Sequence, residues 1–229
     1  MSNSPLVTYT KISPNRASPR NHKIDTITIH CVVGQFTARE ILNLRSFTTR
    51  NPINGASCNY AIGRDGSVGL CVEEKDRSWC ASNRANDHRA ITIECASDKA
   101  HPYAINDTVY KTLIDLLVDI CKRNQIEELK WKGDKSLVGK VDQQNMTVHR
   151  WFAKKACPGD YIYSRLGQIA SEVNAKLNPV LTTPKKSVEE IAKEVIKGLW
   201  GNGQDRKTRL TKAGYDYNEV QKKVNELLK

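Results

Sequence analysis

The stretch TVHRWFAKKACPG at residues 147–159 places an imidazole, two lysine side chains and a thiol in one short segment. Far upstream, residues 25–30 read DTITIH, an alternating apolar run that predicts a strand ending on His30. Two histidines and one cysteine suit Zn²⁺ and leave a fourth tetrahedral position for water. If His30, His149 and Cys157 meet in the fold, the sequence predicts a hydrolase, because zinc bound in this way polarises carbonyl groups and supplies hydroxide near neutral pH.

None of these three residues indicates a metal site by itself. A histidine that closes a strand is more often a hydrogen-bonded core residue, and the spacing of His149 and Cys157 is not that of a helix face. The hypothesis therefore depends on the conjunction of the three. Lysines precede Cys157, and their charge should favour its thiolate. The other six cysteines are expected to be small buried residues in a reduced compartment; they are Cys31, Cys58, Cys71, Cys80, Cys95 and Cys121.

Length and charge restrict the possible functions. The 229 residues, 39% of them apolar, are enough for one sizeable domain plus a small one. A net charge of +11 favours a polyanionic partner, either nucleic acid, anionic lipid or a cell wall. No zinc-finger spacing or RNP motif supports nucleic acid. No apolar run is long enough for a membrane helix and residues 1–5, MSNSP, do not resemble a signal peptide, so we expect synthesis and retention in a cytoplasm until release.

The pattern of elements predicts an α/β domain over residues 1–177, with a mixed central sheet flanked by helices. Asp65-Gly66 lies between two apolar runs and predicts a hairpin. Strands are expected at 25–33, 57–63, 67–72 and 89–95, helices at 37–48, 106–123 and 162–177, and a long polar loop at 130–146.

A second unit is predicted after a proline-containing linker at residues 178–186. Ser187 and Glu190 form a capping-box pattern, and three short helices should follow within residues 187–229. A unit this small has a marginal core, and such a module is more often a binding unit than an enzyme.

Four motifs together resemble the zinc-dependent N-acetylmuramoyl-L-alanine amidases, a group that includes phage endolysins, the T7 lysozyme type and peptidoglycan-recognition proteins. They are the strand end at His30, the NYAIGRDG run at 59–66, the ITIE run at 91–94 and the segment 149–159. The resemblance covers about residues 20–177. It implies that His30, His149 and Cys157 are the zinc ligands. It also implies cleavage of the amide between the lactyl group of N-acetylmuramic acid and the L-alanine of the stem peptide.

The same resemblance implies two catalytic residues. Glu94 is expected to act as general base and then acid, the alternative being an edge-strand carboxylate in solvent. Lys155 is expected to stabilise the tetrahedral intermediate, the alternative being a solvated loop lysine. The chain departs from some relatives because Cys58 occupies the slot of their catalytic tyrosine, and Tyr60, two residues on, is expected to pack. Aromatic groups that either line a groove or pack are Trp79, His88 and Trp151.

The tail resembles the cell-wall-binding repeat of the Cpl-7 lysozyme type through WGNG at 200–203, AGYDY at 213–217 and the arginines between them. This resemblance implies binding to the peptidoglycan muropeptide unit. Trp200, Arg206 and Tyr215 are the expected contacts, although each can instead build the small core.

The sequence therefore predicts a phage or prophage endolysin that is freed from the host cytoplasm by a holin-type partner and then acts on the cell wall. Two alternatives remain open. One is a non-catalytic peptidoglycan-recognition protein, against which the complete His, His, Cys and Glu set argues. The other is a cytosolic amidase that recycles wall fragments, against which the tail repeat argues.

Overall fold

The computed structural model describes residues 2–179 and 186–229, which belong to two compact units, Met1–Pro179 and Val180–Lys229. Most of the predicted linker, residues 180–185, lies outside the described residues. Within the described ranges, no helix has the length and apolar character needed to cross a bilayer.

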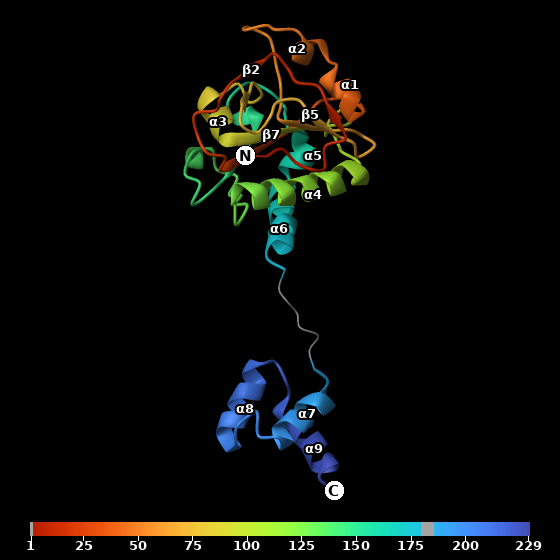
Figure 1. Cartoon of the computed structure of the whole chain (residues 1–229), viewed down its shortest axis with the longest axis vertical. Helices are drawn as coiled ribbons and strands as arrows, with labels where there is room; N and C mark the ends of the chain where they lie inside the picture. Colours follow the sequence, from red (N-terminus) through yellow and green to blue (C-terminus); the bar gives the residue numbers. More distant parts are fainter. Residues whose placement is uncertain (1, 180–185) are drawn as a thin grey trace. The chain divides into compact units, whose positions relative to one another are not determined.

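The first unit is built on a six-stranded mixed sheet, which confirms the predicted fold class (Figure 1). Strands β4 and β5 form the antiparallel hairpin predicted around Asp65-Gly66, and the other pairings are parallel. Gly66 has φ +80°, the left-handed conformation that this turn needs. In spatial order the strands are β1 (Tyr9–Thr10), β5 (Val68–Leu70), β4 (Tyr60–Ile62), β7 (Ala90–Cys95), β3 (Thr26–Cys31) and β8 (Met146–Thr147).

The centre of the sheet is fully buried. All six residues of β3 are buried between β7 and β8, as expected for a parallel strand covered on both faces. A separate two-stranded sheet pairs β2 (Arg16–Ala17) with β6 (Arg77–Ser78). His30 and Glu94 therefore reach the same end of the sheet from its most rigid part.

Helix α4 (Asp107–Asn124) buries the predicted apolar face and packs against α6 (Leu166–Leu177). Its N-cap, Asn106, accepts a hydrogen bond from the Val109 amide. The remaining helical segments of this unit are α1 (Ala38–Leu42), α2 (Arg45–Thr48), α3 (Arg84–Arg89), α5 (Gly159–Tyr163) and two 3₁₀ turns, η1 (Lys135–Leu137) and η2 (His149–Trp151).

Two predicted helices are each divided in the structure. Thr37 makes a capping box with Glu40 at the predicted start, but the helix stops at Asn43, whose side chain donates to the Arg39 carbonyl. Leu44 is then extended, with ψ 138°, before α2 begins. The helix predicted over 162–177 is likewise divided into α5 and α6. The apolar periodicity continued across both breaks, so spacing alone could not reveal them.

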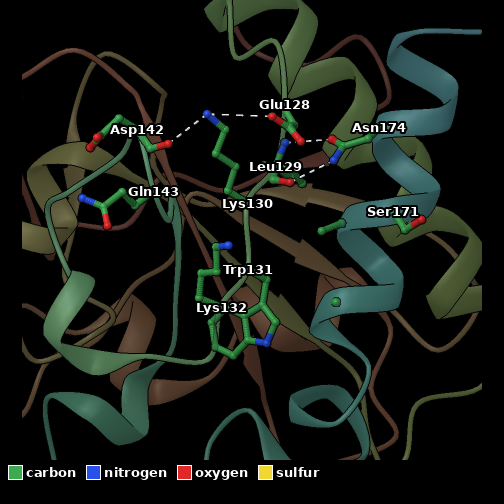
Figure 2. Close-up of a pocket in the computed structure, with 11 residues that line it drawn as sticks. Glu128, Leu129, Lys130, Trp131, Lys132, Asp142, Gln143, Ser171 and Asn174 are labelled. Carbon is green, nitrogen blue, oxygen red and sulfur yellow. Dashed lines mark hydrogen bonds and ion pairs between the residues drawn. The ribbon is translucent and has the colours of Figure 1, made fainter.

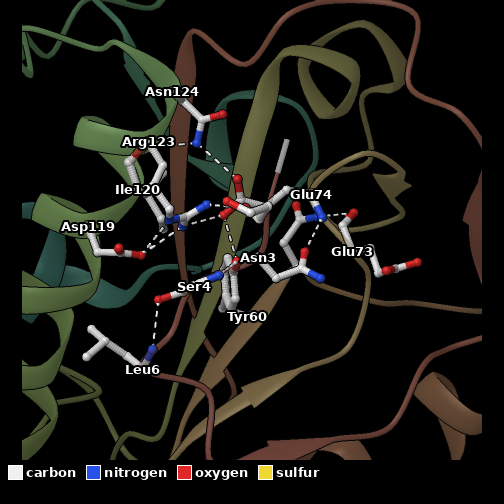
Figure 3. A network of polar contacts seen from close by, with 12 residues as sticks. Asn3, Ser4, Leu6, Tyr60, Glu73, Glu74, Asp119, Ile120, Arg123 and Asn124 are labelled. Atoms are coloured by element: carbon white, nitrogen blue, oxygen red, sulfur yellow. Dashed lines mark hydrogen bonds and ion pairs between the residues drawn. The ribbon is translucent and has the colours of Figure 1, made fainter.

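Tyr60 lies in a buried polar network that ties the N-terminal residues to the sheet and α4 (Figure 3). Its hydroxyl donates to Glu74 Oε1 at 2.6 Å and accepts from the Ser4 amide at 2.8 Å. Arg123 pairs with the same Glu74 oxygen at 2.6 Å. Burial and the Glu74 carboxylate raise the pKa of Tyr60, so the structure uses this hydroxyl as a neutral structural donor.

The second unit consists of α7 (Val188–Ile196), α8 (Gly203–Lys212) and α9 (Tyr217–Leu227). The predicted Ser187–Glu190 capping box is present at the start of α7. Helix α8 begins at Gly203, directly after its N-cap Asn202. A small separate core holds the unit together and consists of Ile191, Ala192, Val195, Leu210, Val220 and Val224.

Candidate metal centre and active-site cleft

His30, His149 and Cys157 offer ligand atoms that all lie within 4.8 Å of one another. Cys157 Sγ lies 3.3 Å from His30 Nδ1. The two imidazole rings meet edge to face, with centroids 5.2 Å apart. Three residues from the end of β3, from η2 and from the following loop thus converge on one point, an arrangement that can hold a zinc ion with an open fourth position.

The chemistry of these donors fits a metal ion. His30 is fully buried, and its Nδ1 faces the Cys157 thiol at 3.3 Å. Burial, followed by the neighbouring His149, lowers the pKa of His30 to about 3. Burial and then Lys155 lower the pKa of His149. Both imidazoles are therefore neutral at physiological pH, which is the form that binds metals.

The thiol of Cys157 does not follow the expectation drawn from its lysine neighbours. A hydrogen bond with Cys31, followed by burial, raises the pKa of Cys157, and Lys154 and Lys155 are exposed side chains. Thiolate formation at Cys157 therefore needs a metal ion or another local source of positive charge.

A buried hydrogen-bond triad fixes the segment that leads into His149. The hydroxyls of Thr28 and Thr147 lie 2.7 Å apart on neighbouring strands. Asn86 of α3 donates to Thr28 at 3.0 Å and accepts from Thr147 at 2.9 Å. Because the triad joins β3, β8 and α3, it sets His149 in register with His30. Ser82 Oγ lies 2.9 Å from His149 Nε2, which leaves Nδ1 as the ring nitrogen available to a metal.

Arg150 holds the loop between His149 and Cys157 in shape. Its guanidinium donates to the Ala156 carbonyl at 2.6 Å and to Asp160 at 2.9 Å, and it lies over the Tyr163 ring. Its backbone amide donates to the Cys157 carbonyl at 3.2 Å. Two candidate ligands that are eight residues apart in the sequence are thus connected by the residue that follows the first.

Glu94 lies opposite His30 in the pairing of β3 and β7. Burial, followed by the charge of Cys31, raises the pKa of Glu94 to about 8. Cys80 Sγ lies 3.8 Å from Glu94 Oε1. A carboxyl group with such a pKa can both take up and release a proton near neutral pH, as a general acid–base residue must.

A cavity of about 620 Å³ opens beside this cluster, and both His149 and Lys155 line it. Trp79, Arg77 and Arg84 also line it. Lys155 is close enough to His149 to lower the pKa of that histidine. The charged side chains of this lining are thus three basic ones, Arg77, Arg84 and Lys155, and one acidic one, Asp87.

The other aromatic candidates divide between packing and the cleft. Trp79 lines the cleft. His88 is buried and its Nδ1 accepts from the Asn21 amide at 3.1 Å. Trp151 is 9% exposed and stacks on Trp131 at 5.1 Å. His88 and Trp151 therefore pack.

Trp131 also lines a separate cavity of about 680 Å³, shown in Figure 2, which contains none of the candidate metal ligands. Lys130 reaches across it between Glu128 and the Asp142 carbonyl.

Sequence reasoning missed Ser82, Asn86 and Cys80, which contact His149, Thr147 and Glu94. They lie in a loop and a short helix between strands, where no spacing rule applies. Only the fold brings them to the cluster.

In the second unit, Trp200 lines a cavity of about 550 Å³ with Leu199, Arg209 and Lys212. Tyr215 meets the Trp200 ring edge to face at 6.1 Å. Arg206 is engaged within the unit, donating to the Gly201 carbonyl and to Asn202 and Gln221 side chains.

The mixed sheet and the His, His, Cys cluster beside a cleft define a hydrolase-type α/β domain. The model of the N-acetylmuramoyl-L-alanine amidase family matches residues 20–160, more than half of the chain, and the chain belongs to this family. A second family model, the CW_7 repeat, matches residues 189–228.

A known protein is similar to part of the chain. The lysozyme of Streptococcus phage Cp-7 is 60% identical over 42 residues, which are 18% of this chain and 12% of that lysozyme. The chain thus spans about an eighth of the length of that relative.

PlyL is a solved structure of similar fold, with a TM-score of 0.52 and 16% sequence identity, covering 72% of this chain and 95% of PlyL. A selenomethionine derivative of AmpD has a TM-score of 0.53 and 18% identity, covering 73% of this chain and 96% of that one. A third is a mutant endolysin from Bacillus subtilis, with a TM-score of 0.51 and 15% identity, covering 73% of this chain and 99% of that one. At these identities the likeness concerns the fold.

Proposed function

We propose that the chain is a phage-type peptidoglycan hydrolase that cleaves the amide between N-acetylmuramic acid and the L-alanine of the stem peptide. The observation that carries this proposal is the convergence of His30, His149 and Cys157 beside a cleft in a domain of the amidase family. In this proposal the three residues hold Zn²⁺, with His149 binding through Nδ1.

The chain's own residues divide the chemistry. A bound zinc ion polarises the scissile carbonyl and lowers the pKa of water. Glu94 takes the proton from the attacking water and returns it to the leaving amine, a task that its pKa of about 8 suits. The ammonium group of Lys155 stabilises the negative charge that develops on the carbonyl oxygen. Ser82 holds the His149 ring in one orientation through its contact with Nε2, the ring nitrogen that does not bind the metal in this proposal.

The second unit serves as a wall anchor in this proposal. The match to the CW_7 repeat supports this role, together with the cavity beside Trp200. Trp200 and Tyr215 offer apolar ring surface to sugar rings. Arg206 shapes the Gly201–Asn202 turn and can still offer a charged face to a muropeptide carboxylate. Tethering raises the local concentration of wall substrate at the catalytic unit without new contacts there.

We further propose that the protein is held in the host cytoplasm until a holin-type partner permeabilises the membrane. The net charge of +11 then favours its accumulation on the anionic wall.

The decisive experiment incubates purified cell walls with the protein and measures new N-terminal alanine. We expect new alanine termini that disappear on chelation, return with Zn²⁺ and are absent in Cys157→Ser. New reducing sugar ends without new alanine termini would instead identify a glycosidase and overturn the proposal.

The same preparation separates the two alternatives. A recognition protein binds walls and releases no alanine. A recycling amidase cleaves soluble muropeptides and leaves intact walls unchanged. Removal of residues 187–229 should weaken wall binding and spare cleavage of a soluble muropeptide, and unchanged wall binding would contradict the anchor role.

A further inference from the structure

A second group of potential metal ligands shares His30 with the candidate centre. His30, Cys80 and Glu94 offer ligand atoms that also lie within 4.8 Å of one another. Cys80 comes from the segment after β6, so this set draws on a part of the chain that the first set does not use. Cys80 and Glu94 are both half-buried, and His30 is fully buried.

Two buried polar atoms in this second set have no partner. Among the described residues, neither His30 Nε2 nor Glu94 Oε2 makes a hydrogen bond. Cys80 Sγ contacts Glu94 through the other carboxylate oxygen, Oε1. Most buried polar atoms of native proteins are satisfied, because leaving one unpaired costs about 1–3 kcal/mol. Two orphaned atoms in neighbouring potential ligands thus call for a partner that binds imidazole and carboxylate together.

We propose that His30, Cys80 and Glu94 form a second binding site for a soft divalent cation such as Zn²⁺ or Cd²⁺. The combination of thiolate, imidazole and carboxylate is the donor set that these ions select over Mg²⁺ and Ca²⁺. As the ion binds, the Cys80 thiol releases its proton to solvent. When both sites are filled, His30 binds one ion through each ring nitrogen, and its remaining ring proton is also released to solvent. No oxidant or reductant is involved. The first and second sites overlap at His30 and at no other ligand.

The overlap has a functional consequence that rests on the proposed catalytic role of Glu94. An ion in the second site occupies the Glu94 carboxylate and prevents it from taking a proton from water. Excess Zn²⁺ therefore inhibits the enzyme, while the ion of the first site is required for activity. Cys80 decides whether this inhibition occurs, since it contributes to the second set alone.

Cobalt binding tests the site directly, because Co²⁺ bound to thiolate absorbs in the near ultraviolet. In Cys157→Ser the first site has lost its only thiolate. We expect this variant to retain a thiolate-to-cobalt band when titrated with Co²⁺, and the double variant Cys157→Ser/Cys80→Ser to lose it. As a matched control, Cys157→Ser/Cys121→Ser removes a buried thiol of α4 and should keep the band. Circular dichroism spectra verify that each variant is folded.

A second variant removes the carboxylate and leaves the thiol in place. Cys157→Ser/Glu94→Gln should bind Co²⁺ at least tenfold more weakly than Cys157→Ser, in line with the effect of losing a ligand-shell group. Equal affinity would remove Glu94 from the site.

Wild-type protein distinguishes failure of this inference from failure of the proposed function. A thiolate band in the wild type that vanishes completely in Cys157→Ser leaves the first site intact and overturns the second. No band in either protein overturns both. In wall-cleavage assays, the rate of the wild type should fall as Zn²⁺ exceeds the level that saturates the first site, and the rate of Cys80→Ser, relative to its own maximum, should not. Equal inhibition of both proteins would contradict the role of Cys80.

Discussion

His30 and Glu94 are direct register partners on the neighbouring parallel strands β3 and β7. Partners in such a pair lie on the same face of a sheet, so a candidate ligand and a candidate base keep a fixed separation that no loop can change. On the other side of β7, Glu94 is also the register partner of Ala61 on the parallel strand β4.

Replacing the carboxylate should separate catalysis from metal binding. We expect Glu94→Ala to retain one equivalent of zinc and to lose roughly 10²- to 10⁴-fold in turnover, the usual contribution of a general acid–base group. Zinc content and the release of N-terminal alanine from walls measure the two properties. The exposed Glu127→Ala is the matched control and should keep both. A near-normal rate in Glu94→Ala would overturn its assignment.

Arg150→Ala should weaken metal binding without contacting the metal. The change removes the donors to Ala156 and Asp160 that hold the loop between His149 and Cys157. Supporting contacts of this kind typically change metal affinity about 10- to 100-fold. Competition with a chromophoric chelator measures the affinity, and the neighbouring Lys154→Ala should leave it unchanged. If both variants bind zinc equally well, the loop does not depend on Arg150.

Gly159→Ala should destabilise the first unit and the metal centre together. Gly159 has φ +83°, and an added Cβ would lie 2.7 Å from Tyr103 Cβ and 2.9 Å from the Pro102 carbonyl oxygen. Backbone strain of this kind costs about 1–3 kcal/mol before the clash is added. Gly133→Ala is the matched control: its φ is also positive, at +71°, but the nearest atom lies 3.8 Å away. Thermal unfolding should rank Gly159→Ala well below Gly133→Ala, and equal losses would show that only the backbone conformation matters.

Asp87 should make the first unit less stable as the pH rises from about 4 to 6. Burial raises the pKa of Asp87 to about 6 from an ordinary 3.8, against the opposing hydrogen bonds from the Cys80 and Ala81 amides. The folded state binds the proton more tightly, so its contribution is complete below pH 3.8 and is lost as the pH passes through 6. Two pKa units correspond to about 3 kcal/mol.

Urea unfolding of the wild type and Asp87→Asn at several pH values measures this contribution. As the pH rises from about 4 to 6, the free energy of unfolding of Asp87→Asn should increase relative to that of the wild type. The free energy of unfolding of the exposed Asp142→Asn should change with pH as that of the wild type does. Parallel curves for the wild type and Asp87→Asn would contradict the assignment.

The elements with strong local signals could be predicted from the sequence. The strand that ends at His30, the Asp65-Gly66 hairpin and the amphipathic helix before Asn124 all follow from periodicity or turn chemistry. The breaks at Leu44 and Arg165 could not, because an apolar face that continues across a break looks the same as one unbroken helix.

The candidate site likewise contains some residues that could be predicted from the sequence and others that could not. The residue types of His30, His149 and Cys157 form a chemical pattern that is visible in the sequence, and Glu94 was singled out through the family resemblance. Ser82, Asn86 and Cys80 could not be predicted, since their importance comes from contacts between segments far apart in the chain. The raised pKa of Cys157 was also missed, because Cys31 and burial outweigh the charges of adjacent lysines.

The strand order also governs how the molecule is made. The two neighbours of β3, which are β7 at Ala90–Cys95 and β8 at Met146–Thr147, both leave the ribosome long after β3 itself. Ile27 and Ile29 therefore have no sheet partners until β7 has been made, about half-way through the synthesis of the first unit. Pairing over such sequence separations makes folding slow and leaves apolar strand edges open to other chains in the meantime. The rigidity that the central strand gives to the finished cluster thus comes with a long unprotected interval during translation.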